Sequence, residues 1–515
     1  MPVTLAEIAR DLRCPLPPGA GAELVTDVAA DSRAVEPGTL WFALPGQRHH
    51  GLDFEEQARR RGAVAVVSDR PARTLPTLVV RAPRPALGPL ASRLHGDPSR
   101  RLPVFGVTGT NGKTSTTYLL DAGLAGAGIP RGLLGGIVAR TPARSEPATR
   151  TTPEADVIAG HLARCVADGA GAAVLEVSSH GLTEHRVDGT HFACVAFTGL
   201  ARDHLDHHGS MESYFAAKAA LFDPARSERA VVAVDDAWGL RLAGRALLPT
   251  VTCTTTPGVA ADWRATDIHA ELTGTRFRAH GPAGSFPVRL RLLGTHQVRN
   301  ALIALAVLAG AGIHPERAAA GMAGLGVVPG RLERVDAGQD FLAFVDYAHN
   351  EDGQRAVLSW ARTATAGRLI VVIGATGDRD PGKRAVLGRT AAQRADLVVV
   401  TDESPEHESA PELRRQVLAG ATGGASGAAT VEIADRGAAI RHAVAAARPG
   451  DLVLLAGRGA DTVQRYAAAT RRFDDRAELE AALRDRRAPA PPRGDSGPAA
   501  TRLPGGLATP SRTAP

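Results

Sequence analysis

A short glycine-rich segment constrains the fold of this chain more than any other feature. It reads Gly109-Thr-Asn-Gly-Lys-Thr114, follows an apolar run at residues 104–108 and precedes a run with helical spacing at 114–125. Glycines permit a tight turn that points backbone N–H groups at phosphate oxygens, and the N-terminus of the following helix adds its dipole. The pattern predicts a phosphate-binding loop between a strand and a helix, with a plain glycine turn as the alternative.

The loop is a variant of the P-loop of nucleotide-binding proteins. The standard spacing requires a glycine where this chain has Val107. In the standard arrangement the lysine amine reaches the β- and γ-phosphates and the threonine hydroxyl binds Mg²⁺. We therefore expect ATP and Mg²⁺ as cofactors, with ATP bound by Gly109, Thr110, Asn111, Gly112, Lys113, Thr114 and Ser115.

Lysine is rare in this chain. Lys and Arg together number 60, but only three of these residues are lysines: Lys113, Lys218 and Lys383. An amine can lose its proton and react, whereas a guanidinium stays protonated. We infer that the lysines carry functions that arginine cannot supply, with chance retention as the alternative. For Lys218, in a helix-like segment at 211–221, the alternative is a surface lysine whose stem covers apolar neighbours.

Composition excludes several classes of protein. At 515 residues the chain is too long for one compact core. The longest apolar run, 301–313, is interrupted by glycines, and the N-terminus lacks the apolar segment of a signal peptide, so we expect a cytoplasmic protein without membrane insertion. A net charge of +6 without a basic and aromatic cluster argues against nucleic acid as a partner. The cysteines lack metal-ligand spacing and are expected to be buried small hydrophobes: Cys14, Cys165, Cys194 and Cys253.

The apolar pattern predicts three α/β units and a tail. Residues 1–98 form the first unit and residues 99–335 the second, and both alternate short strands with helical runs. The expected strands are 39–44, 63–67, 104–108, 172–177 and 230–234, and the expected helices are 54–61, 114–125 and 297–308.

The third unit comprises residues 336–487. Its apolar runs, separated by helical stretches, predict a doubly wound parallel sheet with strands at 341–346, 369–374, 396–401 and 451–456. Residues 488–515 are rich in Pro, Ala, Gly and Ser, and we expect them to form a disordered tail.

Further motifs follow one another over nearly the whole ordered chain. They are Asp31-Ser32-Arg33, Leu40-Trp-Phe-Ala-Leu-Pro-Gly46, Thr151-Thr152-Pro153-Glu154, Glu176-Val-Ser-Ser-His-Gly-Leu182, His185-Arg186-Val187, Arg202-Asp-His-Leu-Asp206, Ala216-Ala217-Lys218, Gly294-Thr-His-Gln-Val-Arg-Asn300, Gly330-Arg331-Leu-Glu333, Asp346-Tyr-Ala-His-Asn350 and Gly377-Asp-Arg-Asp-Pro-Gly-Lys-Arg384. With the variant loop, this series resembles the Mur ligase family, and within it the MurE type.

The resemblance implies a fold and a reaction. It implies an N-terminal uridine-nucleotide-binding domain, a central P-loop ATPase domain with a parallel sheet, and a C-terminal Rossmann-like amino-acid-binding domain. The implied reaction is the ATP-dependent addition of an amino acid to UDP-N-acetylmuramoyl-L-alanyl-D-glutamate in peptidoglycan biosynthesis, through an acyl phosphate. Two anions meet in such a reaction, so cations must screen them. The partners would be this uridine-nucleotide dipeptide and an amino acid, and the protein is expected to be a monomer.

The resemblance also assigns roles residue by residue. It implies Mg²⁺ ligands at Thr114, Glu176 and His204, a carbamylated Lys218, and catalysis by Lys113, Lys218, Glu176 and His204. Without it, Glu176 would be a capped strand end and His204 a solvated loop histidine. The remaining implied contacts are to ATP at Asn300, Arg331, Asp346 and His349, to the uridine-nucleotide substrate at Ser32, Thr151, Thr152, Ser178 and Arg186, and to the amino acid at Arg379, Lys383, Arg384, Ser404, Glu406, Gly457 and Asp461.

The sequence departs from the family pattern around the amine substrate. Members that add meso-diaminopimelate have Asp-Asn-Pro-Arg where this chain has Glu403-Ser-Pro-Glu406, and Gly-Lys-Gly-His-Glu becomes Gly457-Arg-Gly-Ala-Asp461. A glutamate would repel a distal carboxylate. We therefore expect an amine other than meso-diaminopimelate, such as lysine, ornithine or a neutral amino acid. The alternatives are that Glu406 faces solvent, or that a distal carboxylate is held by Arg379, Arg384 or Arg458.

Three other functions remain open. The same ligation chemistry could act on a different carboxylate in specialised metabolism, which the altered acceptor loop allows. A non-catalytic nucleotide-binding or regulatory protein is a second possibility, against which Lys218 and Glu176 argue. A P-loop hydrolase that uses ATP for motion is the third.

Overall fold

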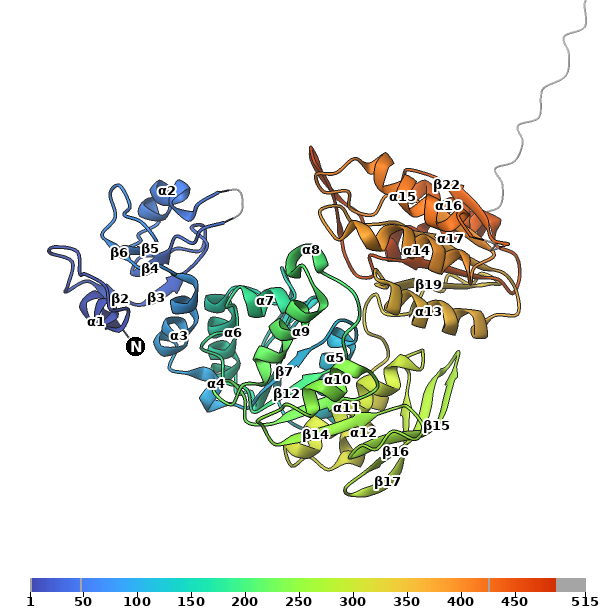
Figure 1. Ribbon diagram of the computed structural model, residues 1–515, viewed down its shortest axis with the longest axis horizontal. Helices are drawn as coiled ribbons and strands as arrows, with labels where there is room; N and C mark the ends of the chain where they lie inside the picture. Colours follow the sequence, from blue (N-terminus) through green and yellow to red (C-terminus); the bar gives the residue numbers. More distant parts are fainter. Residues whose placement is uncertain (1, 47–48, 425–426, 488–515) are drawn as a thin grey trace, which may run out of the picture.

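The computed structural model describes residues 2–46, 49–424 and 427–487. Three large sheets follow one another along the chain, and Figure 1 shows them as three bodies, with the N-terminal domain at the left, the central domain below and the C-terminal domain at the upper right. The α/β fold class with three domains is thus confirmed. The tail expected at residues 488–515 lies outside the described residues.

The N-terminal domain is built on four parallel strands in the order β3-β4-β5-β6. Its strands are β1 (Val3–Thr4), β2 (Leu24–Val25), β3 (Asp27–Ala29), β4 (Thr39–Phe42), β5 (Ala65–Ser68) and β6 (Thr77–Val79). Its helices are α1 (Leu5–Asp11), the 3₁₀ turn η1 (Gly51–Phe54), α2 (Glu55–Arg60), α3 (Arg84–Leu94) and α4 (Pro98–Arg101). β4, β5 and α2 lie where the apolar pattern predicts two strands and a helix.

An eleven-stranded sheet forms the central domain, in the order β10-β9-β8-β11-β7-β12-β13-β14-β15-β16-β17. The strands from β8 to β15 in this order run parallel, and both edges are antiparallel. The strands are β7 (Val104–Thr108), β8 (Arg131–Leu134), β9 (Val138–Arg140), β10 (Ser145–Pro147), β11 (Ala172–Glu176), β12 (Cys194–Phe197), β13 (Ala230–Ala233), β14 (Thr250–Thr254), β15 (Trp263–Glu271), β16 (Gly274–Gly281) and β17 (Gly284–Leu290).

The helices of the central domain cover this sheet. They are α5 (Lys113–Gly126), α6 (Ala155–Ala167), α7 (Ser179–Thr183), α8 (Leu205–His208), α9 (Met211–Ala219) continued by the 3₁₀ turn η2 (Ala220–Phe222), α10 (Ala237–Ala243), α11 (His296–Gly310) and α12 (Pro315–Ala323). The register places Glu176, the last residue of β11, beside Val107 of β7. Because parallel strands end at the same edge of a sheet, Glu176 lies next to the glycine-rich loop that follows β7.

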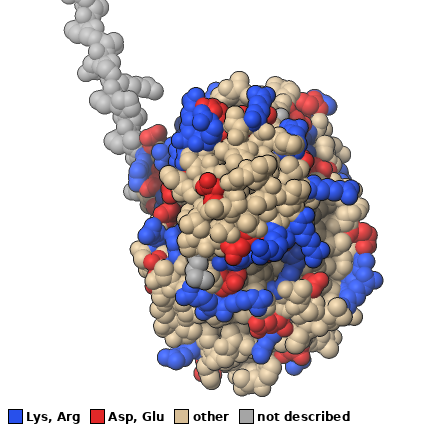
Figure 2. Space-filling model, turned by 90° about the vertical axis from the view of Figure 1, so that its left-hand side faces the viewer, with Lys and Arg blue, Asp and Glu red and all other residues tan. Residues whose placement is uncertain are grey.

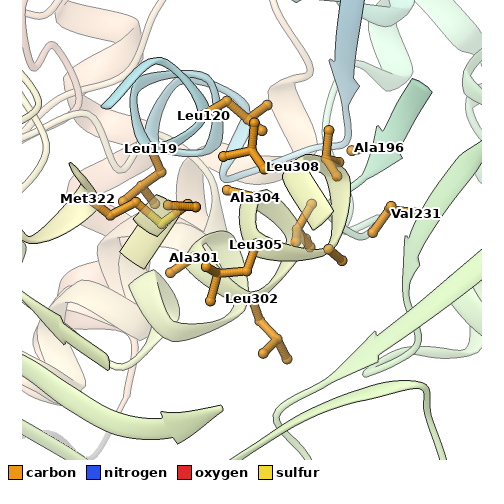
Figure 3. Packing of buried hydrophobic residues seen from close by; sticks show 14 of the residues in the cluster. Leu119, Leu120, Ala196, Val231, Ala301, Leu302, Ala304, Leu305, Leu308 and Met322 are labelled. Atoms are coloured by element: carbon orange, nitrogen blue, oxygen red, sulfur yellow. The ribbon is translucent and has the colours of Figure 1, made fainter. Parts of the chain in front are cut away.

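The phosphate-loop helix is held in place by the core of the central domain. Figure 3 shows Leu119 and Leu120 of α5 beside Ala304, Leu305 and Leu308 of α11. The two helices approach so closely that a Cβ on Gly123 would lie 2.4 Å from the Cδ1 atom of Leu308. Each fully buried leucine contributes about 1.5–3 kcal/mol to stability, so this layer anchors the loop firmly.

The C-terminal domain has six strands in the order β18-β19-β23-β20-β21-β22, parallel except for β18. Its sheet strands are β18 (Glu333–Arg334), β19 (Leu342–Asp346), β20 (Leu369–Ile373), β21 (Leu397–Val400), β22 (Ala429–Glu432) and β23 (Leu452–Ala456), and β24 (Val463–Tyr466) and β25 (Ala469–Arg472) form a separate hairpin. Its helices are α13 (Glu351–Ala364), the 3₁₀ turn η3 (Pro381–Lys383), α14 (Arg384–Ala392), α15 (Ala410–Thr422), α16 (Arg436–Ala446) and α17 (Asp475–Arg487). The four predicted parallel strands are confirmed.

The burial of the cysteines and the apolar character of the helices can be compared with the expectations from composition. Cys165, Cys194 and Cys253 are buried, as expected, whereas Cys14 is only half-buried at the end of the first helix. Among the described helices, none combines the length and the apolar character that crossing a membrane requires.

Candidate functional site

The glycine-rich loop closes tightly between β7 and α5. Gly109 and Gly112 have φ angles of 149° and 89°, in the region that favours glycine. A Cβ on Gly109 would lie 1.9 Å from the hydroxyl oxygen of Thr198, and one on Gly112 would lie 2.5 Å from Oδ1 of Asn300. Val107 is fully buried within β7, so the loop begins two residues later than a standard P-loop. Both glycines are therefore required by the geometry.

Two of the three lysines meet at one carbonyl oxygen of this loop. Lys113 Nζ and Lys218 Nζ donate to the Gly109 carbonyl at 3.0 and 2.9 Å. Lys218 is 1% exposed, and its amine lies 4.7 Å from the centre of the Tyr214 ring. Burial, followed by the charge of Lys113, lowers the pKa of Lys218 well below its ordinary value, which favours the neutral amine. The alternative of a surface lysine is wrong.

Glu176 is joined to the loop through Thr114. The Thr114 hydroxyl donates to Glu176 Oε2 at 3.0 Å, and the backbone N–H of Gly136 donates to Oε1 at 3.0 Å. Arg331 Nη2 donates to the same hydroxyl at 3.2 Å. The carboxylate is 2% exposed. A threonine hydroxyl, a carboxylate and a guanidinium therefore converge at the N-terminus of α5.

His204 lies beside Asp203, with its Nε2 atom 3.7 Å from Asp203 Oδ2, and burial favours a neutral imidazole. Its φ is 55°, and it precedes α8. Burial lowers the pKa of His204 to about 2. Its Nδ1 atom is buried without a hydrogen-bond partner among the described residues. A neutral ring nitrogen with a free lone pair is able to bind a cation.

The three side chains expected to bind Mg²⁺ form an incomplete shell. Within residues 2–46, 49–424 and 427–487, no group of three or more His, Cys, Asp or Glu side chains is placed to hold a metal ion. Mg²⁺ commonly binds to one or two protein groups and completes its shell with water and substrate phosphates. Thr114 and Glu176, which are joined by a hydrogen bond, have the oxygen atoms that such an ion prefers.

Asp203, which the sequence analysis missed, connects the central and C-terminal domains. Its carboxylate accepts hydrogen bonds from His349 Nε2 at 3.1 Å and Asn350 Nδ2 at 3.1 Å, and its Oδ1 accepts from Lys383 Nζ at 3.4 Å. The side chain is 2% exposed. Burial opposes the charge, but His349, His204 and Lys383 hold the pKa of Asp203 well below its ordinary value. The only sequence signal was an acid beside His204 in a polar loop.

The residues expected at ATP lie around the same junction. Asn300 faces Gly112 from α11, and its Nδ2 donates to Gln297 Oε1 at 3.0 Å. Asn111 Nδ2 donates to Asn350 Oδ1 at 3.1 Å, so the loop touches the C-terminal domain directly. Arg331 stacks over Tyr347, with its guanidinium carbon 4.3 Å from the ring centre.

Asp346, also expected at ATP, ends β19 and is buried. Its Oδ2 and Oδ1 accept hydrogen bonds from the backbone N–H groups of Leu332 and Ala348 at 2.6 and 2.7 Å. Burial raises the pKa of this carboxyl. Asp346 therefore fixes the segment that carries Arg331 against the strand end.

Four of the five residues expected at the uridine-nucleotide substrate share one place beside β11. The Thr152 hydroxyl donates to the Glu176 carbonyl at 2.9 Å and accepts from the Ser178 N–H at 2.9 Å, and Arg186 Nη1 donates to the Thr152 carbonyl at 3.2 Å. Thr151 lies against Gly136. The fifth, Ser32, belongs to the N-terminal domain, where its hydroxyl donates to Gln57 Oε1 at 2.7 Å. Figure 2, viewed from the side of the N-terminal domain, shows Lys and Arg side chains gathered around a hollow.

The residues expected at the amino acid do not all lie together. Ser404, Gly457 and Asp461 come together around Arg458, whose Nη1 donates to the Ser404 hydroxyl at 3.2 Å. Burial raises the pKa of Asp461. Lys383 is instead bound to Asp203, and Arg384 is buried and donates to Glu408 at 2.6 Å. Arg379 is exposed.

The chain matches three protein-family models in order. Residues 24–90 match "Mur ligase family, catalytic domain", residues 107–308 match "Mur ligase middle domain", and residues 330–459 match "Mur ligase, glutamate ligase domain". The matches span all three domains described above.

Relatives of similar length carry related names. The chain is 43% identical over 503 residues to the UDP-N-acetylmuramoyl-L-alanyl-D-glutamate--2,6-diaminopimelate ligase of Corynebacterium efficiens, covering 94% of this chain and 95% of that one. It is 39% identical over 472 residues to the UDP-N-acetylmuramyl-tripeptide synthetase of Leifsonia xyli, covering 90% and 92%. A solved structure of a UDP-N-acetylmuramoyl-L-alanyl-D-glutamate--2,6-diaminopimelate ligase aligns with a TM-score of 0.64 at 29% identity, over 94% of this chain and 99% of that one.

The expectation of an amine other than meso-diaminopimelate is not borne out by these relatives. Those that are 43% identical to this chain are named as 2,6-diaminopimelate ligases. The expectation rested on Glu406 alone, but the structure places a cation beside it, because Arg465 Nη1 lies 3.8 Å from Glu406 Oε1. The charge of Glu406 alone therefore does not describe the surroundings of the loop.

Asp203→Asn should open the junction between the central and C-terminal domains. The substitution keeps the shape of the side chain but removes the charge that pairs with Lys383 and attracts His349. We expect a larger radius of gyration by small-angle X-ray scattering, with melting of the separate domains little changed. The control is Asp223→Asn, since Asp223 accepts a local hydrogen bond from the Ala225 N–H. An unchanged radius in Asp203→Asn would contradict the role given to this carboxylate.

Proposed function

The chain belongs to the Mur ligase family and is an ATP-dependent acid–amino-acid ligase, and we propose that it adds 2,6-diaminopimelate to UDP-N-acetylmuramoyl-L-alanyl-D-glutamate. The names of the relatives support this choice of substrates. The observation that carries the proposal is the meeting of Lys113 and Lys218 at the Gly109 carbonyl, beside Glu176 and Thr114. A hydrolase that uses ATP for motion does not need the second buried amine.

The first step joins two anions, and the positive groups of the loop make that possible. When the substrate carboxylate attacks the γ-phosphorus of ATP, charge spreads over the phosphoryl oxygens and must be stabilised. Lys113 follows the glycine turn, and Arg331 reaches the same helix N-terminus from the domain junction. We assign both cations to the transferred phosphoryl group, where fixed charges act with little reorganisation.

Lys218 is assigned a different task from Lys113. Its neutral amine can add to carbon dioxide, forming an N–C bond and releasing one proton, which leaves a carbamate anion. This modification removes one of the two amines that compete for the Gly109 carbonyl and places a negative charge next to Lys113. The change from amine to anion also suits a site that must hold a cation.

Mg²⁺ is assigned to Thr114, Glu176 and His204, with the carbamate of Lys218 beside them. When bound, the ion neutralises charge on the phosphate oxygens. The protein's part is to orient these groups and to disfavour protonation of His204, so that no proton competes with the ion. Glu176 is oriented by Gly136, and burial keeps the His204 ring neutral.

We assign the remaining site residues to the three substrates. Asn300, beside Gly112, and the segment of Asp346 and His349 are assigned to ATP. Thr151, Thr152, Ser178 and Arg186, together with Ser32, are assigned to the uridine-nucleotide dipeptide. The acceptor amine would enter from the C-terminal domain, between Asp461 and the loop at residues 403–406.

ADP should form only when ATP, Mg²⁺, the uridine-nucleotide dipeptide and diaminopimelate are all present. Each component can be omitted in turn while ADP release is followed in a coupled assay. The variant Lys113→Ala should slow turnover by about 10²-fold or more, because the phosphoryl group loses its cation. Equal ADP release without the amine would refute the ligase and favour a hydrolase.

Lys218→Arg and Lys218→Ala should both be nearly inactive, because neither side chain can form the carbamate. A short carboxylate such as acetate should partly restore Lys218→Ala. With ¹³C-labelled bicarbonate, the unaltered protein should show a carbamate signal by NMR that disappears in Lys218→Ala and persists in Lys383→Ala. Full activity of Lys218→Arg would contradict the modification.

A further inference from the structure

The acceptor loop at residues 403–406 is held by the hairpin β24–β25. The Glu406 N–H donates to the Arg465 carbonyl at 3.0 Å, and the Arg465 N–H donates to the Ser404 hydroxyl at 3.3 Å. Glu406 and Tyr466 also form a β-bridge. The loop and the hairpin are therefore held together by backbone contacts. A side chain on the hairpin can contact the same ligand as a side chain of the loop.

Glu406 is held in an unusual conformation. Its φ is 52°, in the left-handed region that bulky residues rarely adopt, and such conformations persist where the surrounding structure enforces them. Its side chain is 22% exposed and lies near the more exposed guanidinium of Arg465. The closest approach, 3.8 Å between Arg465 Nη1 and Glu406 Oε1, is longer than a hydrogen bond. The two charges face each other without being closed into a direct contact.

The guanidinium groups of Arg458 and Arg384, which also lie near the loop, already donate hydrogen bonds to other protein groups. Arg458 is 1% exposed and donates to the carbonyls of Glu403, Asp461, Val463 and Phe473 as well as to the Ser404 hydroxyl. Arg384 is 1% exposed and donates to Glu408, Gln416 and the Arg379 carbonyl.

Arg379 faces a different part of the molecule. The N–H of the neighbouring Asp380 donates to Asp206 Oδ1 at 3.2 Å, so the segment that carries Arg379 lies against the central domain. Arg465 is therefore the exposed cation that lies directly beside Glu406.

We infer that Glu406 and Arg465 together bind the distal amino-acid end of the amine substrate. This inference rests on the proposed function, in which the amine is 2,6-diaminopimelate. That molecule carries an ammonium and a carboxylate at its far end. Glu406 would accept hydrogen bonds from the ammonium, and the planar guanidinium of Arg465 would bind the carboxylate with two parallel hydrogen bonds. The cation that the family places in the acceptor loop is thus supplied here by the hairpin.

The pair would also set specificity between amines. Lysine offers a distal ammonium but no distal carboxylate, so it would engage Glu406 and leave Arg465 without a partner. Discrimination would arise because diaminopimelate gains the contact with Arg465 and lysine does not. The role of Arg465 is therefore visible only when the two amines are compared.

The test compares Arg465→Gln with the unaltered full-length protein, using diaminopimelate as substrate and lysine as substrate or as inhibitor of diaminopimelate turnover. For diaminopimelate, kcat/KM should fall by about 10- to 100-fold, mostly through KM, because a charge-assisted bidentate contact is lost. For lysine the change should stay within about 3-fold. Glu406→Gln should weaken both amines. The control on the same hairpin is Arg472→Gln, whose exposed side chain should leave both values unchanged.

A charge exchange separates recognition from folding. The double variant Glu406→Arg with Arg465→Glu should use diaminopimelate better than either of its single variants, because the pair is restored in reverse order. Equal losses for both amines in Arg465→Gln, or a double variant no better than the singles, would overturn the inference while leaving the proposed function intact. Failure of the unaltered protein to use diaminopimelate would overturn the proposed amine and this inference together.

Discussion

The carbonyl oxygen of Gly109 is the point on which the rest of the site depends. It accepts from two lysine amines that the sequence places 105 residues apart, one on the phosphate-loop helix and one on α9. Two ammonium groups on one oxygen are electrostatically unfavourable, and burial lowers the pKa of both amines, that of Lys218 well below its ordinary value. In the proposed reaction, Lys113 acts on the phosphate and Lys218 is the amine that is modified. The packing of α5 on α11 keeps the loop in position.

A second constraint is that neither the central nor the C-terminal domain holds a complete site. Asp203 gathers His349, Asn350 and Lys383 from the C-terminal domain, and Arg331 reaches Thr114 across the same junction. In the proposed reaction an acyl phosphate would be hydrolysed if water reached it, so a site assembled between two domains would protect the intermediate.

Sequence reasoning predicted local structure well and long-range contacts poorly. The strand before the loop, the helix after it and the parallel strands of the C-terminal domain follow from apolar periodicity and are confirmed. The antiparallel extension β15–β17 and the position of β23 between β19 and β20 depend on pairings that no local pattern specifies. Asp203 was missed because its partners are distant in the chain. The expectation for the amine is not borne out by the relatives named as 2,6-diaminopimelate ligases, and it considered Glu406 without Arg465, which the hairpin brings beside it.

The central claim is that the chain joins a carboxylate to an amine through an acyl phosphate, and isotope transfer tests it most directly. The uridine-nucleotide dipeptide is labelled with oxygen-18 in the reacting carboxylate and turned over with ATP, Mg²⁺ and diaminopimelate. Mass spectrometry then follows the label into inorganic phosphate. The account predicts that each phosphate released carries one oxygen from the carboxylate. Phosphate that contains oxygen only from ATP and water would contradict it.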